Sequence, residues 1–375
     1  MTKTSIGVAV IGDGLMAKEH TMALRNVRAV FGADVPQPRL EVIVHPDADR
    51  ARAAAEQYGV ARWSTSWQDA VADPAVDLVD IVTPNIHHRD PALAAASARK
   101  HVWCEKPLAL TSDDAQAMTD AAEAAGVTTL VGFTYLQNPG LALARDLIRR
   151  GELGDLFSFT GFFSADTMID PDVPFTWRTD RALAGGGALG DLGSHMISIA
   201  RNVVGGVSRV SGLSRTVIGE RVDRDGMRRT VDNDDHTLAL LEFDNGAIGT
   251  MQSSRVQTGR AFEVSFVVTG TKGAIRFNQQ DSHVLEVSLE SDGLDTHGFR
   301  TIELGPGHGH FGHLWPMSGI NVGLHELKIF EAWELLQAIA EGRPASPDFR
   351  EALEIERTIE AIERSALRGG EWQLI

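Results

Sequence analysis

Ile6-Gly-Val-Ala-Val-Ile-Gly-Asp-Gly-Leu-Met-Ala17 is the stretch that decides the fold of the first part of the chain. Its first six residues are apolar or glycine, which is typical of a parallel strand covered on both faces. The next six read G-x-G-x-x-A, and residues 17–30 continue with a helical pattern. The stretch therefore predicts a strand, a tight glycine turn and a helix, in that order.

The glycine turn has a specific chemical use. Gly12 permits the tight turn, Gly14 lets the backbone approach a pyrophosphate, and Ala17 lets the helix pack closely on the strand. The N-terminus of the helix supplies free N–H groups and the positive end of the helix dipole. These features predict that the N-terminal part of the chain binds a dinucleotide.

A second stretch matches the same glycine pattern, at residues 185–190. It follows Arg181-Ala-Leu-Ala instead of a strand, and it lies deep in the second half of the chain. The pattern alone is weak evidence, so the strand before it and the helix after it decide between the two matches. We therefore assign dinucleotide binding to the first match only.

The end of the second predicted strand, residues 40–44, departs from the usual dinucleotide pattern. An Asp or Glu commonly stands there and binds the ribose hydroxyls, but this chain has His45. Asp47 is the nearest acid, one position beyond Pro46, and Arg50 is interpreted as a solvated helix residue. We expect Asp47 to bind the ribose hydroxyls, and NAD is favoured over NADP.

Further strands and helices alternate up to residue 135. Strands are expected at 76–82, 101–105 and 128–133, with helices at 47–58, 91–100 and 112–125. Polar turns follow two of these strands, Thr83-Pro84-Asn85 and Glu105-Lys106-Pro107. Open α/β sheets bind ligands at such carboxyl ends. Residues 1–135 are therefore predicted to form a doubly wound parallel sheet, a Rossmann domain.

Lys106 is the residue of this domain most suited to chemistry. A lysine at the end of a buried strand costs desolvation free energy unless a partner or a ligand holds it. Pro107 stops the strand and fixes the direction in which Glu105 and Lys106 leave the sheet. The alternative interpretation is an ordinary surface ion pair between Glu105 and Lys106.

Composition excludes several classes of protein. A chain of 375 residues fits two domains, and its net charge of −16 argues against a nucleic-acid partner. No apolar run approaches the ~20 residues that span a bilayer, and the N-terminus lacks the features of a signal peptide. The single cysteine, Cys104, agrees with a reducing compartment. We expect a cytoplasmic protein with no membrane partner.

The second half opens with a helix at 141–150 and a strand at 157–164. A polar and aromatic loop with Trp177 and Arg178 then leads to a helix that carries Asp191 and His195. These two residues are four apart, so on a helix they share a face, where the carboxylate can orient the imidazole. The alternative is a helix N-terminal Asp beside a structural His.

Short β-rich segments dominate the chain from residue 207 onward. They are predicted at 209–217, 235–243, 247–255, 262–270, 274–277, 284–289 and 299–304, with turns such as Asp244-Asn245-Gly246 between them. Helices at 327–341 and 350–367 follow. Residues 136–375 are therefore expected to form an α+β domain with one large, mostly antiparallel sheet.

Two histidine-containing segments remain. His308, His310 and His313 lie in a glycine-rich loop with no cysteine or nearby carboxylate, so we expect no metal site there. His325 precedes the helix at 327–341. It is a candidate substrate residue, and a helix N-terminal pair with Glu326 is the alternative.

Taken together, the motifs resemble those of the Gfo/Idh/MocA family of sugar and polyol oxidoreductases. The resemblance rests on G-x-G-x-x-A, on Thr83-Pro84-Asn85 with His88, on Glu105-Lys106-Pro107 and on Asp191-x-Gly193-x-His195. It implies hydride transfer to NAD from a secondary alcohol, with His195 as general base, Lys106 as hydrogen-bond donor to the reacting oxygen, and Asp191 orienting the set. It also implies a homo-oligomer, expected to be a tetramer, formed through the open face of the sheet.

The candidate site residues fall into two groups. The cofactor candidates are Gly12, Gly14, Leu15, Met16, His45, Asp47, Thr83, Pro84, Asn85, His88, Glu105 and Lys106. The substrate candidates are Lys106, Tyr135, Gln137, Arg178, Asp191, His195 and His325.

Within the family, the pattern most resembles bacterial inositol dehydrogenases of the scyllo type and their sugar-oxidising relatives. We therefore expect scyllo- or myo-inositol as substrate, with an aldopyranose such as glucose as a second one. The alternatives are a levoglucosan or glucoside 3-dehydrogenase and, in a different class, an NAD-binding sensor or scaffold without catalysis.

Overall fold

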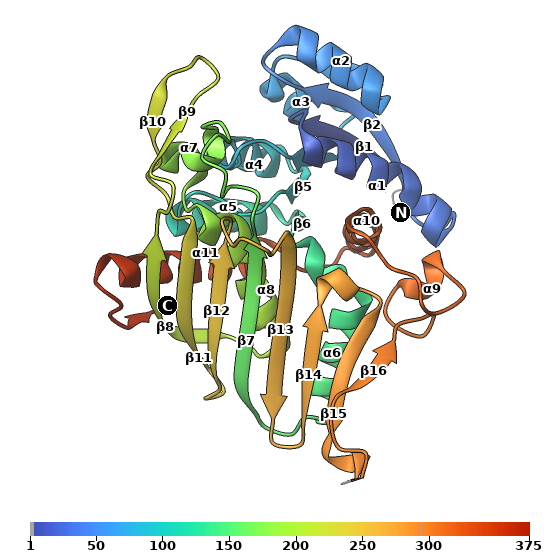
Figure 1. Ribbon diagram of the computed structural model, residues 1–375. Helices are drawn as coiled ribbons and strands as arrows, with labels where there is room; N and C mark the ends of the chain where they lie inside the picture. Colours follow the sequence, from blue (N-terminus) through green and yellow to red (C-terminus); the bar gives the residue numbers. More distant parts are fainter. Residues whose placement is uncertain (1–3, 294) are drawn as a thin grey trace. The chain divides into compact units, whose positions relative to one another are not determined.

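The computed structural model describes residues 4–293 and 295–375, which divide into two compact units (Figure 1). The first unit contains the described residues up to Thr134 together with Leu324–Glu356. The second contains Tyr135–Gly323 and Arg357–Ile375. The boundary near residue 135 was expected, but the return of residues 324–356 to the first unit was not.

The first unit is built on a six-stranded parallel sheet with the order β3-β2-β1-β4-β5-β6. Its core strands are almost wholly apolar, because helices cover both faces of such a sheet. The strand bounds are β1 Ser5–Ile11, β2 Gln37–Val44, β3 Arg62–Ser64, β4 Leu78–Ile81, β5 His101–Cys104 and β6 Thr129–Val131. The predicted doubly wound sheet is confirmed, and β3 is an additional edge strand.

The helices of the first unit begin and end at recognisable caps. Asp47 and Thr111 accept hydrogen bonds at the starts of α2 and α5, and Gly59 and Gly126 end the same helices in the left-handed conformation. The bounds are α1 Leu15–Phe31, α2 Ala48–Tyr58, α3 Trp67–Ala72, α4 Arg89–Ser97, α5 Ser112–Ala125 and α10 Leu324–Glu341.

α10 belongs to the first unit because it packs against α1. Leu335 and Leu336 of α10 lie in the same buried cluster as Leu24 and Val27 of α1. α11, Phe349–Leu367, starts in the first unit and continues into the second. The sequence places α10 in the domain of residues 136–375, whereas the structure places it in the first unit. The apolar pattern of a helix does not show which sheet the helix covers.

The second unit is built on a nine-stranded sheet with the order β16-β15-β14-β13-β7-β12-β11-β8-β17. Within the described residues, β7 and β12 form its only parallel pair. The bounds are β7 Leu156–Ala165, β8 Val207–Arg215, β11 His236–Phe243, β12 Ile248–Ser254, β13 Phe262–Gly270, β14 Gly273–Asn278, β15 Val284–Leu289, β16 Arg300–Glu303 and β17 Gln373–Leu374. The expected large, mostly antiparallel sheet is confirmed.

Helices α6 and α8 pack against one face of this sheet, and Figure 1 shows them on the same side of it. Strand β11 illustrates the two faces, since Ala239 and Leu241 are buried while Leu238 and Leu240 are exposed. Strands β9, Glu220–Val222, and β10, Arg228–Thr230, form a separate antiparallel hairpin that was not predicted from the sequence. The remaining helix bounds are α6 Pro139–Arg149, α7 Arg181–Ala184, α8 Ser194–Val203 and α9 Phe311–Leu314.

Candidate active site

Three polar turns lie together at the carboxyl-terminal end of the parallel sheet in the first unit. They follow β1, β4 and β5, which are neighbours in the sheet and run in the same direction. The turns comprise residues 12–14, 83–85 and 105–107. The chain crosses from β1 to β2 on one side and returns to β4 on the other, which makes this edge the topological switch point where α/β sheets bind ligands.

The glycine turn after β1 leaves an open cradle of N–H donors. Gly12 has a φ of 120°, and a Cβ atom there would lie 2.8 Å from the carbonyl oxygen of Val82. Gly14 has nothing within 4 Å of an added Cβ, and it gives α1 no side-chain cap. The first-turn N–H groups, which include those of Leu15 and Met16, therefore have no side-chain cap, and such groups suit a pyrophosphate.

The end of β2 is arranged differently from the expected ribose site. Asp47 caps α2, since its Oδ1 accepts hydrogen bonds from the N–H groups of Arg50 and Asp49 at 3.1 and 2.9 Å, and these bonds lower the pKa of Asp47. His45 Nδ1 accepts a hydrogen bond from the Asp47 N–H. Arg50 is not merely solvated, because its guanidinium donates to both carboxylate oxygens of Asp13 at 2.8 and 2.9 Å.

His88 connects the turn after β4 with the turn after β5. Its ring nitrogens lie 3.0 Å from the carbonyl oxygens of Thr83 and Pro107, and its side chain is fully buried. Burial lowers the pKa of His88, and the contacts with the carbonyl oxygens of Thr83 and Pro107 oppose that effect. His88 is a cofactor candidate from the sequence, and in the structure its ring connects the two turns through the carbonyl oxygens of Thr83 and Pro107.

Glu105 also differs from its expected position. It is buried, so the alternative of a surface ion pair with Lys106 is wrong. Its Oε1 lies 3.0 Å from His20 Nε2 and accepts a hydrogen bond from Lys328 Nζ at 2.7 Å. Its Oε2 accepts a hydrogen bond from the Lys106 N–H at 3.2 Å. The carboxylate therefore faces the protein interior and holds the backbone of Lys106, whose side chain is half-buried.

In the second unit, Tyr135, Asp191 and His195 gather in one cluster. Asp191 lies in a π-helical turn, Leu189–Gly193, which continues directly into α8 with His195. The His195 ring packs edge-on against Tyr135, with centroids 4.9 Å apart, and lies 5.7 Å from the Phe163 ring. Burial, together with the charge of Asp191, raises the pKa of Tyr135.

The expected α-helical spacing between Asp191 and His195 is interrupted by this π turn. Such turns occur often at functional sites, because they re-aim side chains that a regular helix would present differently. His195 is only 6% exposed. The cluster therefore offers an imidazole with aromatic walls and a nearby carboxylate.

Arg178 and Gln137 lie at two other places in the second unit. Arg178 is in a short 3₁₀ turn, Trp177–Thr179, and its guanidinium carbon lies 4.5 Å from the centre of the Trp177 ring. Its carbonyl oxygen accepts hydrogen bonds from Asn233 Nδ2 and Arg255 Nη1, each 3.0 Å long. Gln137 is half-buried in the turn before α6.

His325 belongs to the first unit. Its Nδ1 lies 3.1 Å from Glu19 Oε2 and its Nε2 lies 3.2 Å from Asn26 Nδ2, and both partners are on α1. The histidine therefore connects the start of α10 to α1. Both of these partners lie on α1, whereas the alternative interpretation paired His325 with Glu326.

Comparison with protein families gives two matches along the chain. Residues 6–133 match the oxidoreductase family with an NAD-binding Rossmann fold, and residues 141–276 match the GFO/IDH/MocA C-terminal domain. The protein is a Gfo/Idh/MocA oxidoreductase. The resemblance stated from the motifs is thereby confirmed, as are NAD as the cofactor and an oxidoreductase as the class of protein.

Individual relatives narrow the type of enzyme. Levoglucosan dehydrogenase of Pseudarthrobacter phenanthrenivorans is 36% identical over an alignment of 377 positions, which covers 97% of each chain. The NAD-dependent scyllo-inositol 2-dehydrogenase of Bacillus subtilis is 29% identical over 289 residues, 76% of this chain and 78% of that one. A solved levoglucosan dehydrogenase in complex with NADH and levoglucosan has a TM-score of 0.96 and 37% identity, over 99% of both chains. This Gfo/Idh/MocA protein is thus an oxidoreductase of the sugar and polyol dehydrogenase type.

The first unit of this Gfo/Idh/MocA protein fits NAD by its own geometry. The open glycine cradle suits the pyrophosphate, as described above. In addition, the Thr83 hydroxyl is buried and has no hydrogen-bond partner among the described residues. A buried hydroxyl without a partner is costly, so a ligand group at this edge of the sheet would satisfy it.

The two glycines of the cradle give the first testable prediction. In Gly14→Ala the free protein keeps its melting temperature, because φ is −77° and an added Cβ meets nothing, but NAD binds at least ~10-fold more weakly because the methyl fills space meant for the pyrophosphate. Gly12→Ala instead lowers the melting temperature, since alanine is strained at positive φ and would contact Val82. Calorimetry of binding and of unfolding measures both effects. Unchanged NAD affinity in Gly14→Ala would contradict the assigned cradle.

The histidines and acidic residues of the described chain were compared with the requirements of a metal site. Among the described residues, no group of three or more His, Cys, Asp and Glu side chains could hold a metal ion. The rings of His310 and His313 lie 6.1 Å apart. Within the same residues, none of the helices combines the length and the apolar character that crossing a bilayer requires.

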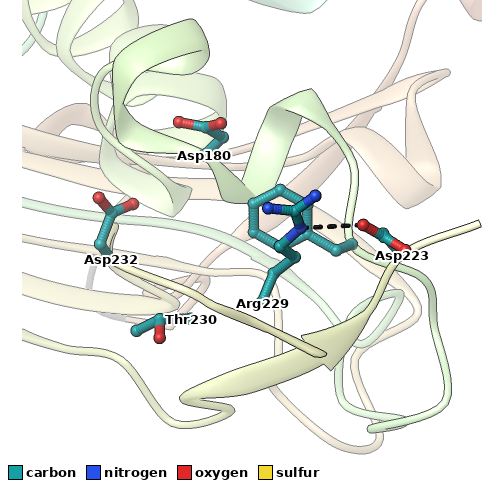
Figure 2. A pocket seen from close by; sticks show the side chains of 6 residues that line it. Asp180, Asp223, Arg229, Thr230 and Asp232 are labelled. Atoms are coloured by element: carbon teal, nitrogen blue, oxygen red, sulfur yellow. Dashed lines mark hydrogen bonds and ion pairs between the residues drawn. The ribbon is translucent and has the colours of Figure 1, made fainter. Parts of the chain in front are cut away.

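A cavity of about 440 Å³ lies beside the β9–β10 hairpin in the second unit (Figure 2). The charged groups that line it already have protein partners. Arg229 pairs with Asp223 at 2.9 Å, Asp180 accepts a hydrogen bond from the Ala182 N–H, and Asp232 accepts one from the Arg181 N–H. None of the predicted site residues lines this cavity, and we assign it no part in the reaction.

Four buried charged residues of the first unit were not among the site residues expected from the sequence. They are His20 on α1, Asp80 on β4, and Lys328 and Glu331 on α10, and each is at most 1% exposed. A signal was available for Asp80, since a carboxylate inside the apolar run Leu78–Ile81 must have a buried partner. Its partner could not be read from the sequence, because His20 and Lys328 come from distant helices.

Proposed function

We propose that this Gfo/Idh/MocA oxidoreductase oxidises a ring secondary alcohol of an anhydrosugar of the levoglucosan class to the ketone. The observation that carries the substrate class is the end-to-end similarity to levoglucosan dehydrogenase, whereas the match to the scyllo-inositol enzyme covers about three quarters of the chain. This ranking reverses the order given by the motifs, which placed inositol first.

The reaction breaks a carbinol C–H bond and an O–H bond and forms one carbonyl. NAD, when bound, accepts the hydride at its nicotinamide ring. His195 is the group we assign to take up the hydroxyl proton. Its buried position between Tyr135 and Phe163 limits competition from water, and the nearby Asp191 carboxylate favours the imidazolium that forms.

Lys106 is assigned to the reacting oxygen. Its ammonium group donates a hydrogen bond and stabilises the negative charge that develops as the proton leaves. The Lys106 backbone is held by Glu105, so the direction of the side chain is set from within the first unit. Arg178 is our candidate for recognising further hydroxyls of the substrate, with Tyr135 and Gln137 as additional contacts.

Inositol stays as the second candidate substrate. It is supported by the similarity to scyllo-inositol 2-dehydrogenase, which acts on a cyclic polyol. Both substrates are neutral rings that carry secondary hydroxyls, so the same acid–base groups serve either one. They differ in the ring oxygen and in the anhydro bridge, which only the sugar has.

Initial rates of NAD reduction with a panel of substrates test the proposal. The panel contains levoglucosan, scyllo-inositol, myo-inositol, D-glucose and L-glucose, each with NAD and with NADP. We expect levoglucosan with NAD to give the highest kcat/KM. A higher value with an inositol would replace the substrate but keep the enzyme type. NAD binding without reduction of any compound would favour a sensor or scaffold.

We also propose that the protein forms a homo-oligomer through the open face of the nine-stranded sheet. Leu213 and Leu238 are paired across β8 and β11 on that face, and both are exposed, as are Leu240 and Ile248. Large exposed apolar side chains in one patch mark association surfaces. The supporting observation is this patch, and sedimentation equilibrium of the full chain decides between a monomer and the expected tetramer.

A further inference from the structure

The charged cluster under the parallel sheet has an unusual requirement for protons. His20 Nδ1 lies 2.8 Å from Asp80 Oδ1, and His20 Nε2 lies 3.0 Å from Glu105 Oε1. An ionised carboxylate only accepts hydrogen bonds, so both ring nitrogens must carry a hydrogen to satisfy both contacts. His20 is therefore an imidazolium in this arrangement, fully buried and stacked on the Trp103 ring with centroids 3.9 Å apart.

The surroundings of His20 support its charge. Burial by itself lowers the pKa of His20, but the charge of Asp80 and the hydrogen bonds to Asp80 and Glu105 outweigh burial and raise it. The Lys328 ammonium opposes this effect. Asp80 Oδ2 has no hydrogen-bond partner within the described part of the chain, so Asp80 depends on His20.

Lys328 is shared by two carboxylates. Its Nζ donates to Glu105 Oε1 at 2.7 Å and to Glu331 Oε1 at 3.3 Å. Glu331 also accepts hydrogen bonds from Trp103 Nε1 at 2.8 Å and from the Thr134 hydroxyl at 2.7 Å. Both oxygens of Glu331 thus accept hydrogen bonds. Lys328, which donates to Glu331 and to Glu105, therefore fixes the Glu105 carboxylate relative to Glu331.

Glu105 is the member of the cluster that contacts the Lys106 backbone. Burial raises the pKa of Glu105, but Lys328, His20 and the positive charge of Lys106 together bring it well below its ordinary value. The cluster contains two cations, His20 and Lys328, and three carboxylates, those of Asp80, Glu105 and Glu331. It therefore carries one excess negative charge, which attracts the Lys106 ammonium.

We propose that His20 and Lys328 are positioning residues for the reaction, which fix the Glu105 carboxylate and through it the backbone and the charge of Lys106. The proposal rests on the proposed function, in which Lys106 contacts the reacting oxygen. A displacement of a catalytic group by 1 Å can cost ~100-fold in rate. The alternative is a buried ion cluster that only stabilises the fold.

The protonation state of His20 is tested first, in the full chain with NAD bound. ¹⁵N NMR of selectively labelled histidine side chains, assigned by the loss of signals in His20→Gln, distinguishes an imidazolium from either neutral tautomer. We expect His20 to be doubly protonated at pH ~6.5, where a free imidazole is about half protonated. A neutral ring at that pH overturns the proposal, whatever the substrate of the enzyme is.

The pH dependence of unfolding gives a second measurement of the same group. Because the folded-state pKa of His20 is raised, the stabilisation that its charge supplies is fully present below the unfolded pKa of ~6.5 and is lost as the pH rises through the folded value. The difference in melting temperature between the wild type and His20→Gln is therefore expected to narrow as the pH rises from ~6.5 through the folded-state pKa of His20. A constant difference contradicts a charged His20.

Kinetics separate positioning from simple stabilisation. We expect His20→Gln and Lys328→Met to lower kcat at least ~10-fold while the Kd for NAD stays close to that of the wild type, and Lys328→Arg to restore most of the rate. The matched control is Thr119→Val, which removes a buried hydroxyl that binds the carbonyl oxygens of Ala115 and Phe349, away from the cluster.

The outcomes distinguish failure of the positioning role from failure of the proposed function. Wild-type kcat in His20→Gln, or an equal loss of kcat in Thr119→Val at a similar loss of melting temperature, overturns the positioning role. Absence of turnover in the wild type with every compound of the panel instead contradicts the proposed function. In that case the NMR measurement still decides whether His20 is the imidazolium on which the inference depends.

Discussion

His195→Ala is expected to lower kcat by at least ~100-fold with the best substrate, because the variant has no side chain that can take up the hydroxyl proton. Binding of NAD should be unchanged, since the glycine cradle belongs to the first unit and His195 to the second. Steady-state kinetics with NAD, together with calorimetric titration of NAD, measure both quantities.

The neighbouring tyrosine does not replace His195 as the base. Burial and the charge of Asp191 raise the pKa of Tyr135, so its hydroxyl stays protonated at neutral pH and can only donate to the substrate oxygen. His297→Ala serves as the matched control, because His297 is an exposed histidine of the same unit. Near-wild-type turnover in His195→Ala would remove His195 from the mechanism.

Lys106→Met is expected to lower kcat by ~100-fold to ~1000-fold, the loss typical when one donor to a developing oxyanion is removed. Methionine keeps the length and most of the volume of the side chain, so the loss reports the missing charge and hydrogen bond. The Glu105 carboxylate keeps its bond to the backbone N–H of residue 106, which limits the effect on folding.

Lys106→Arg should retain more activity than Lys106→Met, because it keeps the positive charge but changes the donor geometry. Lys272→Met is the matched control, an exposed lysine in the turn before β14. The role assigned to Lys106 fails if Lys106→Met turns over at the control rate with an unchanged melting temperature.

Most of the fold could be predicted from local patterns. The apolar runs and the turns after them identify five of the strands in the parallel sheet, because a buried parallel strand has little sequence freedom. Arg62–Ser64 escaped notice, since a three-residue edge strand with an exposed Trp63 has no apolar pattern. The hairpin of β9 and β10 is likewise short and polar.

The roles of the candidate site residues stay predictions. Asp191 and His195 were named from one motif and Tyr135 from its place after the last predicted strand of the first unit, and the structure brings these three side chains into one cluster. His88 and Glu105 were placed at the correct turns, but their side chains face the interior. A sequence shows that a residue ends a strand, but the direction of its side chain depends on partners such as Lys328, more than 200 positions away.

Transfer of deuterium from substrate to cofactor tests the central claim, that this protein removes a hydride from a ring carbon of an anhydrosugar. The wild-type enzyme is incubated with NAD and with levoglucosan deuterated at its ring carbons, and the mass of the reduced nicotinamide cofactor is determined. The account predicts a cofactor that carries one deuterium and a sugar oxidised to a ketone. Bound NAD that stays oxidised and unlabelled would contradict it.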